Sequence, residues 1–424
     1  MKRISAVIIG AGSRGTIYSN IMESMPEKFE VVAVAEPIES RRNYIKDHHN
    51  LNDEMCFNDW RPLLEKGKVA DIAVIATMDR DHYDVAIEAL RAGYDLLLEK
   101  PIAPTPEECE KITSLALSLN KKVVICTVLR YTNVFGKIKE IVDSGKIGDI
   151  VSVTHEECVG NVHQSHSFVR GNWGNEEESS FMLLQKCCHD IDLLSWLIGK
   201  KCKKIQSFGA LSYFREENAP EGAPLYCIDG CPKAETCLYN AVKLYYDDKE
   251  NLWFREMSTM QHNPSDEAVE KSIRETRYGK CVYKCGNNVV DHQSVNMLFE
   301  DDITVCLNMN AFNKGGRRMH VMGTKGEITA YLEDSAMIKV YNFDTRTTEE
   351  IDAEGKDGIV AGHGGGDRGI IEDLYDYLIG TYKGKSVPEI DESLENHMIV
   401  FAAEEARKTG TIVDFDEYLK KFRK

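Results

Sequence analysis

The chain carries the sequence ISAVIIGAGSRG at residues 4–15, where an apolar run of strand length leads directly into a Gly-x-Gly-x-x-Gly turn and then into a helical pattern. In such a turn Gly10 permits the tight bend, Gly12 lets a pyrophosphate approach the backbone, and Gly15 lets the helix pack closely on the strand. The start of the helix offers free N–H groups and a partial positive charge to the phosphates. The turn therefore predicts a dinucleotide-binding site.

The first third of the chain continues this alternation of strands and helices. Strands are expected at residues 4–9, 31–35, 71–76, 94–98 and 122–127, and helices at 80–92 and 106–120. Continuous apolar strands separated by amphipathic helices are typical of a parallel sheet that is covered on both faces. Because each crossover should be right-handed, we expect a doubly wound α/β domain over residues 1–127.

Glu36 ends the second expected strand, where its carboxylate can accept hydrogen bonds from the two ribose hydroxyls of an adenosine. This carboxylate would repel a 2′-phosphate, which favours NAD over NADP. Arg41 and Arg42 follow closely, and either side chain can receive a phosphate, so NADP remains an alternative.

Glu99-Lys100-Pro101 follows the fourth expected strand. Ligands bind at the carboxyl ends of parallel strands in sheets of this kind. We therefore expect Lys100 to reach toward the nicotinamide; the alternative is that Glu99 and Lys100 form an ordinary surface ion pair. The predicted cofactor-binding residues are Gly10, Gly12, Ser13, Arg14, Gly15, Glu36, Thr77, His82, Glu99 and Lys100.

The pattern changes after residue 127. We expect a helix at 134–143, a strand at 150–157, a polar loop up to residue 180, and strands at 204–214, 294–300, 304–311, 319–322 and 338–343. Apolar and polar residues alternate along two of these strands, which is typical of an antiparallel sheet with one covered face. Residues 128–424 are expected to form an α+β domain with a large, mostly antiparallel open sheet and a cysteine-containing insertion at about 220–290. Its C-terminal helices can pack back on the Rossmann domain.

At roughly 150 residues per domain, the length of 424 residues predicts two domains, with three as the alternative. The net charge of −17 argues against a nucleic-acid binder, because an acidic surface repels phosphate backbones. No apolar run approaches the ~20 residues that span a bilayer, and the N-terminus lacks a signal-peptide pattern, so we expect a cytoplasmic protein with no membrane partner. The thirteen cysteines are accordingly expected to be reduced.

Three motifs together resemble the family of glucose–fructose oxidoreductase, inositol dehydrogenase and the rhizopine-catabolism protein MocA, the Gfo/Idh/MocA family. They are the glycine turn at 10–15, Glu99-Lys100-Pro101 and His189-Asp190-Ile191-Asp192, and shorter matching stretches lie at 130–131, 144–148 and 322–326. The resemblance covers most of the chain. It implies an N-terminal Rossmann domain, a C-terminal α/β domain, an NAD(P)-dependent dehydrogenase acting on a CH–OH group, and a homodimer or homotetramer formed through the open sheet.

The resemblance also implies that Lys100 and His189 handle the substrate proton. An alcohol cannot readily lose hydride while it keeps its proton, so a base within roughly 3 Å of the hydroxyl is needed. The spacing of apolar residues from residue 191 onward predicts that segment 185–192 starts a helix, with His189 in its first turn. Without the resemblance, a single histidine at a helix start is more often structural.

One position departs from the family pattern. Many inositol-dehydrogenase-like members have an aspartate four residues before this histidine, and here Gln185 occupies that position. Gln185 can hydrogen-bond the substrate but carries no charge, so a Lys–Asp–His relay is in doubt. We hypothesise that Lys186 faces the substrate as a second cation or proton donor; a surface or helix-capping role is the alternative. Asp192 is expected to orient His189 or to cap backbone groups beside the substrate.

The loop expected before this helix is rich in groups that bind sugars. Hydrogen-bonding side chains and an aromatic surface for C–H faces suit a sugar or polyol better than an apolar substrate. His163, Arg170 and Trp173 are the favoured substrate-binding residues, together with His363 in the glycine-rich segment 362–366. The competing interpretation is a solvated loop for the first three and a plain linker for His363.

Five cysteines gather in the insertion, with the spacings Cys227-x3-Cys231-x5-Cys237 and Cys281-x3-Cys285. Four thiolates can bind a structural zinc ion or an iron–sulfur cluster in a loop that has little core of its own. The candidate ligands are Cys227, Cys231, Cys237 and Cys285. The spacing differs from the CxxC pairs of common zinc ribbons, so free thiols without a metal are the favoured interpretation.

The sequence therefore predicts an NAD-dependent oxidoreductase that transfers a hydride between nicotinamide and a secondary alcohol of a sugar, glycoside or polyol. The expected catalytic residues are Lys100, His189 and Lys186. One alternative is a glycosidase or lyase in which bound NAD oxidises the sugar transiently, elimination follows, and NAD is regenerated. A second alternative is an NAD-bound sensor or regulatory subunit, against which the presence of Lys100 and His189 argues.

Overall fold

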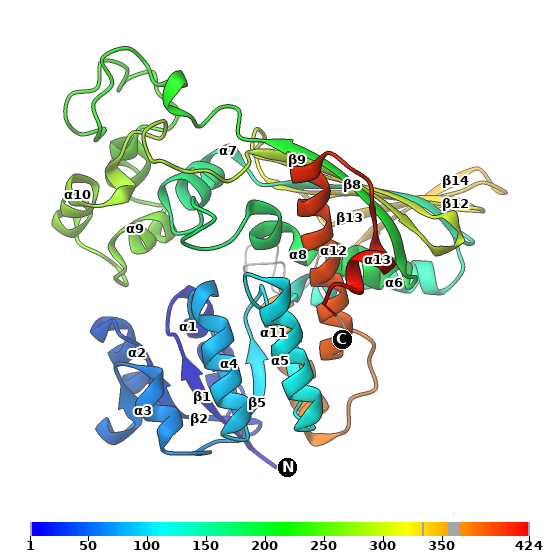
Figure 1. The fold of residues 1–424 in the computed structure, drawn as a ribbon, viewed down its shortest axis with the longest axis horizontal. Helices are drawn as coiled ribbons and strands as arrows, with labels where there is room; N and C mark the ends of the chain where they lie inside the picture. The colour runs from blue at the N-terminus through cyan, green and yellow to red at the C-terminus, as the bar shows by residue number, and fades with distance from the viewer. Residues whose placement is uncertain (1, 333–334, 355–364, 423–424) are drawn as a thin grey trace.

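A computed structural model describes residues 2–332, 335–354 and 365–422. Figure 1 shows two sheets, one in the N-terminal part below and one spreading to the upper right, with the segment that carries α9 and α10 at the upper left. The predicted fold class is confirmed, because a parallel Rossmann sheet is followed by a second, mostly antiparallel sheet.

The Rossmann sheet has six parallel strands in the order β3-β2-β1-β4-β5-β6. The strands are β1 (Ile4–Ile9), β2 (Phe29–Ala35), β3 (Cys56–Phe57), β4 (Ile72–Ile75), β5 (Asp95–Leu98) and β6 (Val123–Ile125). The strand order reverses between the neighbours β1 and β4, and in such sheets a crevice opens at the carboxyl ends of the strands at this point. Both strands are almost wholly apolar and buried, as a sheet covered on both faces requires.

Helices cover both faces of this sheet. One face packs against α1 (Ser13–Glu23), α2 (Glu39–His49) and α11 (Gly366–Ile379), and the other against α3 (Trp60–Glu65), α4 (His82–Arg91) and α5 (Pro106–Ser118). The start of α5 follows from its sequence, because Thr105 Oγ1 accepts a hydrogen bond from the backbone N–H of Glu108 and Pro106 occupies the first turn. A helix from the C-terminal part of the chain, α11, thus completes the N-terminal domain.

The second sheet has nine strands in the order β14-β13-β12-β11-β7-β10-β9-β8-β15. They are β7 (Ile150–Cys158), β8 (Cys202–Ala210), β9 (His292–Phe299), β10 (Thr304–Asn310), β11 (Gly316–Gly323), β12 (Gly326–Leu332), β13 (Met337–Asn342), β14 (Thr347–Asp352) and β15 (Val413–Asp414). Only β7 and β10 pair in parallel within the described sheet. Along β10, Val305, Leu307 and Met309 are buried while their neighbours are not, which matches the alternation in the sequence.

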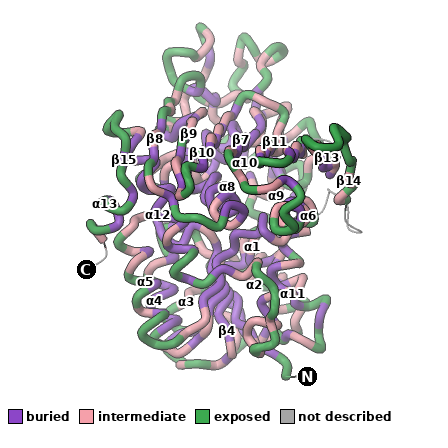
Figure 2. The backbone as a smooth tube through the Cα atoms, turned by 90° about the vertical axis from the view of Figure 1, so that its right-hand side faces the viewer, coloured by how far each residue is buried: buried purple, intermediate pink, exposed green. Residues whose placement is uncertain are grey.

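The buried face of the second sheet packs against four helices. They are α6 (Asn133–Asp143), α8 (Met182–Ile198), α12 (Ile390–Thr409) and α13 (Phe415–Leu419). Helix α12 also contacts α5 of the Rossmann domain, so one hydrophobic core runs between the two sheets. Figure 2 shows this as buried chain through the lower sheet, α8 and the upper sheet, with exposed chain at the periphery.

The segment expected to be a polar loop up to residue 180 is helical over much of its length, and that prediction was wrong there. Helix α7 (Asn161–His163) continues into the helical turn Gln164–Arg170, all of which is buried. The polar character of the segment was misleading because its polar side chains are buried against the rest of the fold instead of facing solvent. Arg170, for example, donates hydrogen bonds to the carbonyl oxygens of Tyr239 and Lys280 in the insertion.

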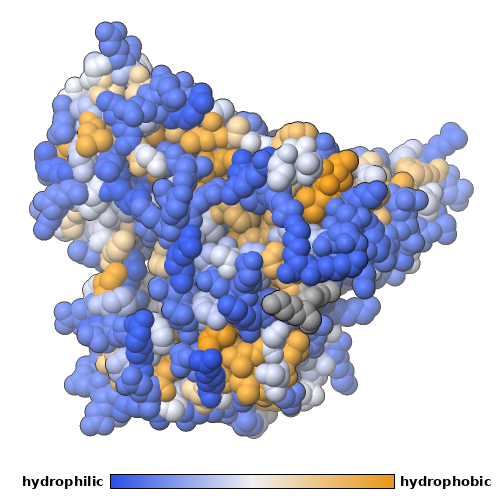
Figure 3. Space-filling view, in the orientation of Figure 1, coloured by the Kyte–Doolittle hydropathy of each residue, from blue (hydrophilic) through white to orange (hydrophobic). Residues whose placement is uncertain are grey.

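The insertion carries α9 (Leu252–Thr259) and α10 (Asp266–Glu275), and it contributes to two small hydrophobic clusters, one of which also includes Val169, Phe214 and Ala311. It also reaches the Rossmann domain, since the rings of Tyr44 in α2 and His262 lie 4.7 Å apart between centroids. Most of the face drawn in Figure 3 is hydrophilic, with scattered hydrophobic patches. No described helix combines the length and apolar composition that crossing a bilayer demands.

Candidate active site

A cavity of about 450 Å³ lies where the carboxyl ends of the Rossmann strands face α8 and the insertion. Its lining combines residues from the glycine turn, the loops after β4 and β5, α8, β11 and α9. They are Ser13, Arg14, Ile17, Ala76, Thr77, Asp79, Glu99, Lys100, His163, Phe168, Trp173, Gln185, Lys186, His189, Trp253, Met257, Arg317 and Asp367.

The glycine turn has the geometry that a dinucleotide needs. Gly10 has a φ of +88°, and a Cβ there would lie 2.5 Å from the carbonyl oxygen of Ala76; a Cβ on Gly15 would lie 1.9 Å from that of Gly10. Only glycine fits at both positions. Gly12 precedes α1 without a side-chain cap, so the first N–H groups of the helix remain available to phosphate oxygens. The turn therefore fits NAD.

Glu36 stands at the end of β2, beside this turn, as predicted. Its carboxylate oxygens accept hydrogen bonds from the backbone N–H groups of Ala11, at 2.6 Å, and Ile38, at 2.9 Å. Each oxygen retains a lone pair for a ribose hydroxyl. Arg42 donates to the carbonyl oxygens of Glu36 and Pro37. The guanidinium of Arg42 is thus engaged by the backbone, whereas Arg41 Nη1 lies 3.7 Å from where a Cβ on Gly12 would stand, beside the turn. The Glu36 carboxylate favours NAD, and Arg41 keeps the NADP alternative open.

Arg14 and Glu99 line the cavity but also bind each other, with Arg14 Nε 2.8 Å from Glu99 Oε1. Arg14 also donates to Asp367 in the first turn of α11, and Tyr18 donates to Glu99. Burial alone would raise the pKa of Glu99, but the positive charges of Arg14 and Lys100 lower it overall. Asp367 was missed in the sequence because 353 positions separate it from Arg14.

Lys100 extends from the end of β5 to α8, where its Nζ donates to the main-chain oxygen of Gln185 at 2.7 Å. Gln185 and His189 lie four residues apart on one face of α8, and both line the cavity. The Gln185 amide donates to Ser179 Oγ and Ser180 Oγ at 3.2 and 3.1 Å. Lys100, Lys186, Gln185 and His189 are therefore brought together at one end of the cavity.

His189 does not lie in the first turn of its helix, and that prediction was wrong. Helix α8 begins at Met182, so His189 stands in the interior of the helix. Phe181, at the N-cap position, makes no side-chain capping hydrogen bond. The sequence therefore lacks the capping residue that usually marks the start of a helix. The apolar residues 182–184 extend the helix because they are buried in the core between the sheets.

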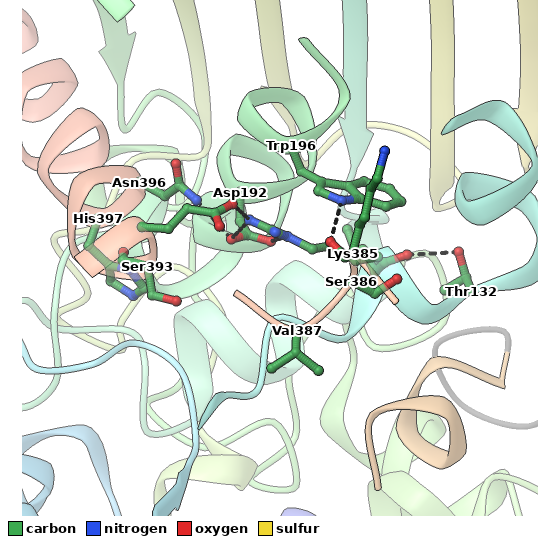
Figure 4. A network of polar contacts seen from close by, with 12 residues as sticks. Thr132, Asp192, Trp196, Lys385, Ser386, Val387, Ser393, Asn396 and His397 are labelled. Atoms are coloured by element: carbon green, nitrogen blue, oxygen red, sulfur yellow. Dashed lines mark hydrogen bonds and ion pairs between the residues drawn. The ribbon is translucent and has the colours of Figure 1, made fainter. Parts of the chain in front are cut away.

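Asp192 takes a different position from the one expected, since it neither lines the cavity nor binds His189. Its carboxylate forms a two-point ion pair with Arg130, at 2.6 and 2.7 Å, and accepts from Asn396 Nδ2 at 2.9 Å. Figure 4 shows Asp192 and Asn396 close together, from α8 and α12 respectively. Asp192 therefore fixes the packing of α8 rather than contacting a substrate.

Two of the predicted substrate residues, His163 and Trp173, line the cavity, and Arg170 does not. Burial, followed by the charge of Lys186, lowers the pKa of His163 well below its usual value. Trp173 Nε1 is buried without a hydrogen-bond partner in the described part of the chain, which leaves it available to a ligand. His363 lies outside the described residues.

Thr77 and His82 share one corner of the predicted cofactor site. The ring nitrogens of His82 lie 2.7 Å from the Pro101 carbonyl oxygen and 3.3 Å from that of Thr77. His82 thus joins the loops after β4 and β5 without lining the cavity. Thr77 lines it, and its buried Oγ1 has no hydrogen-bond partner among the described residues.

Lys186 faces the cavity next to a residue that the sequence did not single out, Arg317 of β11. Glu157 joins them, with its oxygens 3.2 Å from Lys186 Nζ and 2.7 Å from Arg317 Nη2. Nothing local marks Arg317, because its neighbours in space come from strands and helices far along the chain. Trp253 and Met257 of the insertion were missed for the same reason.

The cysteines of the insertion gather only in part as expected. Cys227, Cys231 and Cys237 line one small cavity together with Cys281, whereas the Sγ of the predicted fourth ligand, Cys285, donates to the Cys281 carbonyl oxygen at 3.3 Å. No described group of three His, Cys, Asp or Glu residues is arranged to hold a metal ion. A metal site here stays the less favoured alternative to free thiols.

Comparisons with known proteins agree with this architecture. Residues 4–127 match the oxidoreductase family with an NAD-binding Rossmann fold, and residues 139–415 match that family's C-terminal α/β domain. The putative oxidoreductase YteT of Bacillus subtilis is 25% identical over 339 residues, covering 74% of this chain and 76% of that protein. An inositol 2-dehydrogenase of Salmonella typhimurium is 26% identical over 206 residues, covering 48% of this chain and 57% of that protein.

Solved structures share the fold at lower identity. The apo scyllo-inositol dehydrogenase of Lactobacillus casei superposes with a TM-score of 0.65 at 17% identity, covering 98% of this chain and 99% of that one. An oxidoreductase of Agrobacterium radiobacter, solved with NAD+, L-tartaric acid and magnesium, gives 0.69 at 12% identity, with 98% and 99% covered. With both of its domains matched, the chain belongs to the Gfo/Idh/MocA family of NAD-binding oxidoreductases.

Proposed function

We propose that this protein oxidises or forms a secondary alcohol of a sugar, glycoside or polyol with NAD as the redox partner. The observation that carries the proposal is the single cavity that joins the glycine turn, Lys100 and His189. The similarity of part of the chain to inositol 2-dehydrogenases supports a polyhydroxylated substrate.

NAD, when bound, supplies the acceptor for the hydride. The chain supplies the groups that hold the substrate and move its proton. Lys100 Nζ uses one of its donors on the Gln185 carbonyl oxygen and has others for a substrate hydroxyl. His189 lines the same cavity and assists in taking the hydroxyl proton, and Gln185 orients the substrate instead of the aspartate usual in this position.

Aromatic side chains fit the apolar faces of such a substrate. Trp173, Phe168 and Trp253 line the cavity, and the ring of His163 lies 5.5 Å from that of Trp253. Together with the hydrogen-bonding groups of α8, they offer the combination of stacking surface and polar contacts that a sugar ring requires.

The decisive experiment is a screen of sugars, glycosides and polyols with NAD and NADP, followed by the absorbance of reduced nicotinamide. The best substrate is then tested with Lys100→Met, for which kcat should fall by about 10²- to 10⁴-fold. The affinity for NAD should fall much less than kcat, because the glycine turn that holds the pyrophosphate is unaltered. Lys111→Met, an exposed lysine on α5, is the matched control and should retain wild-type kinetics.

Two other outcomes would contradict simple dehydrogenation, and a third would contradict the role of Lys100. Cleavage of a glycoside with no net reduced nicotinamide would instead support transient oxidation followed by elimination. NAD binding without turnover of any substrate would support a sensor. Equal kinetics of Lys100→Met and the wild type would remove Lys100 from the reaction.

We also propose that copies of this chain associate through the open face of the nine-stranded sheet. Helices α6, α8, α12 and α13 cover the other face, while Phe208 and Tyr331 remain 58% and 59% exposed on the open one. A homodimer or homotetramer would cover these rings.

A further inference from the structure

Within the described part of the chain, two charged residues of the second domain line the cavity, and both are positively charged. They are Lys186 of α8 and Arg317 of β11. The acidic lining residues, Asp79, Glu99 and Asp367, instead belong to the Rossmann side, where Arg14 pairs with the last two. The cavity is therefore cationic at the end where the substrate of the proposed reaction would bind.

The two cations are held from behind by buried carboxylates. Glu157 bridges them, and Arg317 Nε also donates to Asp190 Oδ1 at 2.8 Å. The side chains of Glu157 and Asp190 are 1% and 0% exposed. Burial would raise the pKa of Asp190, but Arg317 and His155 lower it, so this carboxylate is ionised at neutral pH. Such a scaffold fixes the positions of the two cations.

Both cations keep hydrogen-bond donors for a ligand. Arg317 uses Nε and Nη2 on the two carboxylates, and its Nη1 has no hydrogen-bond partner within residues 2–332, 335–354 and 365–422. Lys186 has one ion pair, to Glu157, and its ammonium group carries three donors. Both side chains also line a neighbouring polar cavity of about 360 Å³, which gives a ligand group room beside them.

We infer that the substrate carries a carboxylate, which binds Lys186 and Arg317, so that the substrate class is a sugar acid such as a hexuronate. The inference rests on the proposed function and narrows it. A planar carboxylate suits the flat end of a guanidinium beside an ammonium group. Because Glu157 and Asp190 already offset the charges of Lys186 and Arg317, a singly charged carboxylate is accommodated here more readily than a doubly charged phosphate.

The test uses matched sugars and the full chain loaded with NADH, which prevents oxidation during binding. D-glucuronate, D-galacturonate and D-mannuronate are compared by calorimetry with D-glucose, D-galactose, D-mannose and the three hexose 6-phosphates. At least one hexuronate should bind ten times more tightly than its neutral hexose and its phosphate. In Lys186→Gln the preference over the neutral hexose should shrink to threefold or less.

Arg317→Gln should abolish the preference as well, but it leaves two buried carboxylates with less compensation and can reduce stability. Lys186→Gln avoids this, because Glu157 keeps its ion pair with Arg317. Lys137→Gln is the matched control. Lys137 lies on α6, away from the cavity, where it pairs with Glu140 at the surface. This variant should retain the full preference.

The inference is overturned if no hexuronate is preferred over its hexose, if a phosphate is preferred, or if the preference survives in Lys186→Gln. Failure of the proposed function looks different. A hexuronate that binds with the predicted preference, yet never reduces NAD in a separate assay, would refute dehydrogenation and leave the carboxylate site intact. A neutral sugar that reduces NAD while no acid is preferred would do the reverse.

Discussion

Arg130 and Asp192 form an ion pair whose side chains are 0% and 1% exposed, so their charges depend on each other. In Asp192→Asn one charge disappears and the buried guanidinium is left with the half-exposed Glu392 as its acidic partner. We expect the free energy of unfolding to fall by about 3 kcal/mol, since breaking a buried pair strands a charge. Urea unfolding measures this.

The same variant distinguishes a packing role for Asp192 from a role in the site. The folded fraction of Asp192→Asn should bind NAD within twofold of the wild type. If the variant keeps its stability but loses kcat, the packing role is wrong and Asp192 acts in the substrate site, as the sequence suggested.

His166 makes the fold sensitive to acid. It packs against Phe254 and Tyr278, and burial, followed by the charge of Arg170, lowers its pKa to about 3. The unfolded chain takes up a proton below the usual histidine pKa of about 6.5 while the folded chain does not, so stability is complete above that pH and falls below it. At pH 5 this one group removes about 2 kcal/mol.

Urea midpoints at pH 7 and pH 5 test this. The loss between the two pH values should be about 2 kcal/mol smaller in His166→Phe than in the wild type. His48→Gln, on the exposed face of α2, should leave the loss unchanged. An equal loss in His166→Phe and wild type would show that other groups control the acid sensitivity.

At the residue scale, the sequence predicted those site residues that are marked by a local motif. The glycine turn, Glu36 and Lys100 lie at the carboxyl ends of strands. In a parallel sheet these ends form the ligand-binding site. Arg317, Asp367 and Trp253 carry no such mark. They reach the cavity through pairings between β11, α11 or α9 and the rest of the fold, and a single sequence does not reveal those pairings.

Elements were predicted where hydrophobic periodicity was strong and missed where it was weak. β1 was expected at its observed bounds, and the expected helix at 106–120 matches α5 to within two residues. Strand β3 was not predicted because it has only two residues. The helical turn 164–170 was not predicted because the burial of its polar side chains depends on contacts with the insertion. Tertiary contacts, rather than propensity, shape both.

The junction between β1 and α1 is an element-scale feature that one methyl group can test. In Gly15→Ala the new Cβ meets the Gly10 carbonyl oxygen at 1.9 Å, so α1 must move away from the turn. We expect a loss of about 1–3 kcal/mol in stability from overpacking. The affinity for NAD, measured by calorimetry, should fall at least tenfold because the N–H groups of the helix are displaced.

Gly136→Ala in α6 is the matched control, since nothing lies within 4 Å of a Cβ there. This variant should bind NAD normally and gain up to about 1 kcal/mol, the usual advantage of alanine over glycine inside a helix. Normal NAD affinity in Gly15→Ala would show that the turn is not the cofactor site.

The whole molecule places its cavity between two sheets that share one core. α11 returns from the second half of the chain to cover the Rossmann sheet, and α12 lies between α8 and α5. The insertion adds Trp253 and Met257 to the cavity and touches α2 through His262. Both domains and the insertion therefore contribute to the walls of the cavity.

One face of the nine-stranded sheet has no helix over it in the described part of the chain. Strand register places Phe208, Ser294, Asn308, Glu156, Arg318 and Tyr331 in one row across that face. Because directly paired residues point to the same side of a sheet, Phe208 and Tyr331 stand at the two ends of this row. Polar residues, including the Glu156–Arg318 ion pair, occupy the middle of the row, so an interface here would contain hydrogen-bonding groups between two aromatic side chains.

We expect light scattering to show a dimer or tetramer for the wild type. The double variant Phe208→Arg/Tyr331→Arg should be a monomer, because two copies facing each other would bring the new positive charges together. An interface of standard size buries about 1,200–2,000 Å², so loss of both rings should raise the dissociation constant at least a hundredfold. Leu238→Arg, which charges a 71% exposed leucine in the insertion, should leave the assembly intact. A wild-type monomer, or an assembly that Leu238→Arg disrupts and the double variant does not, would place the interface elsewhere.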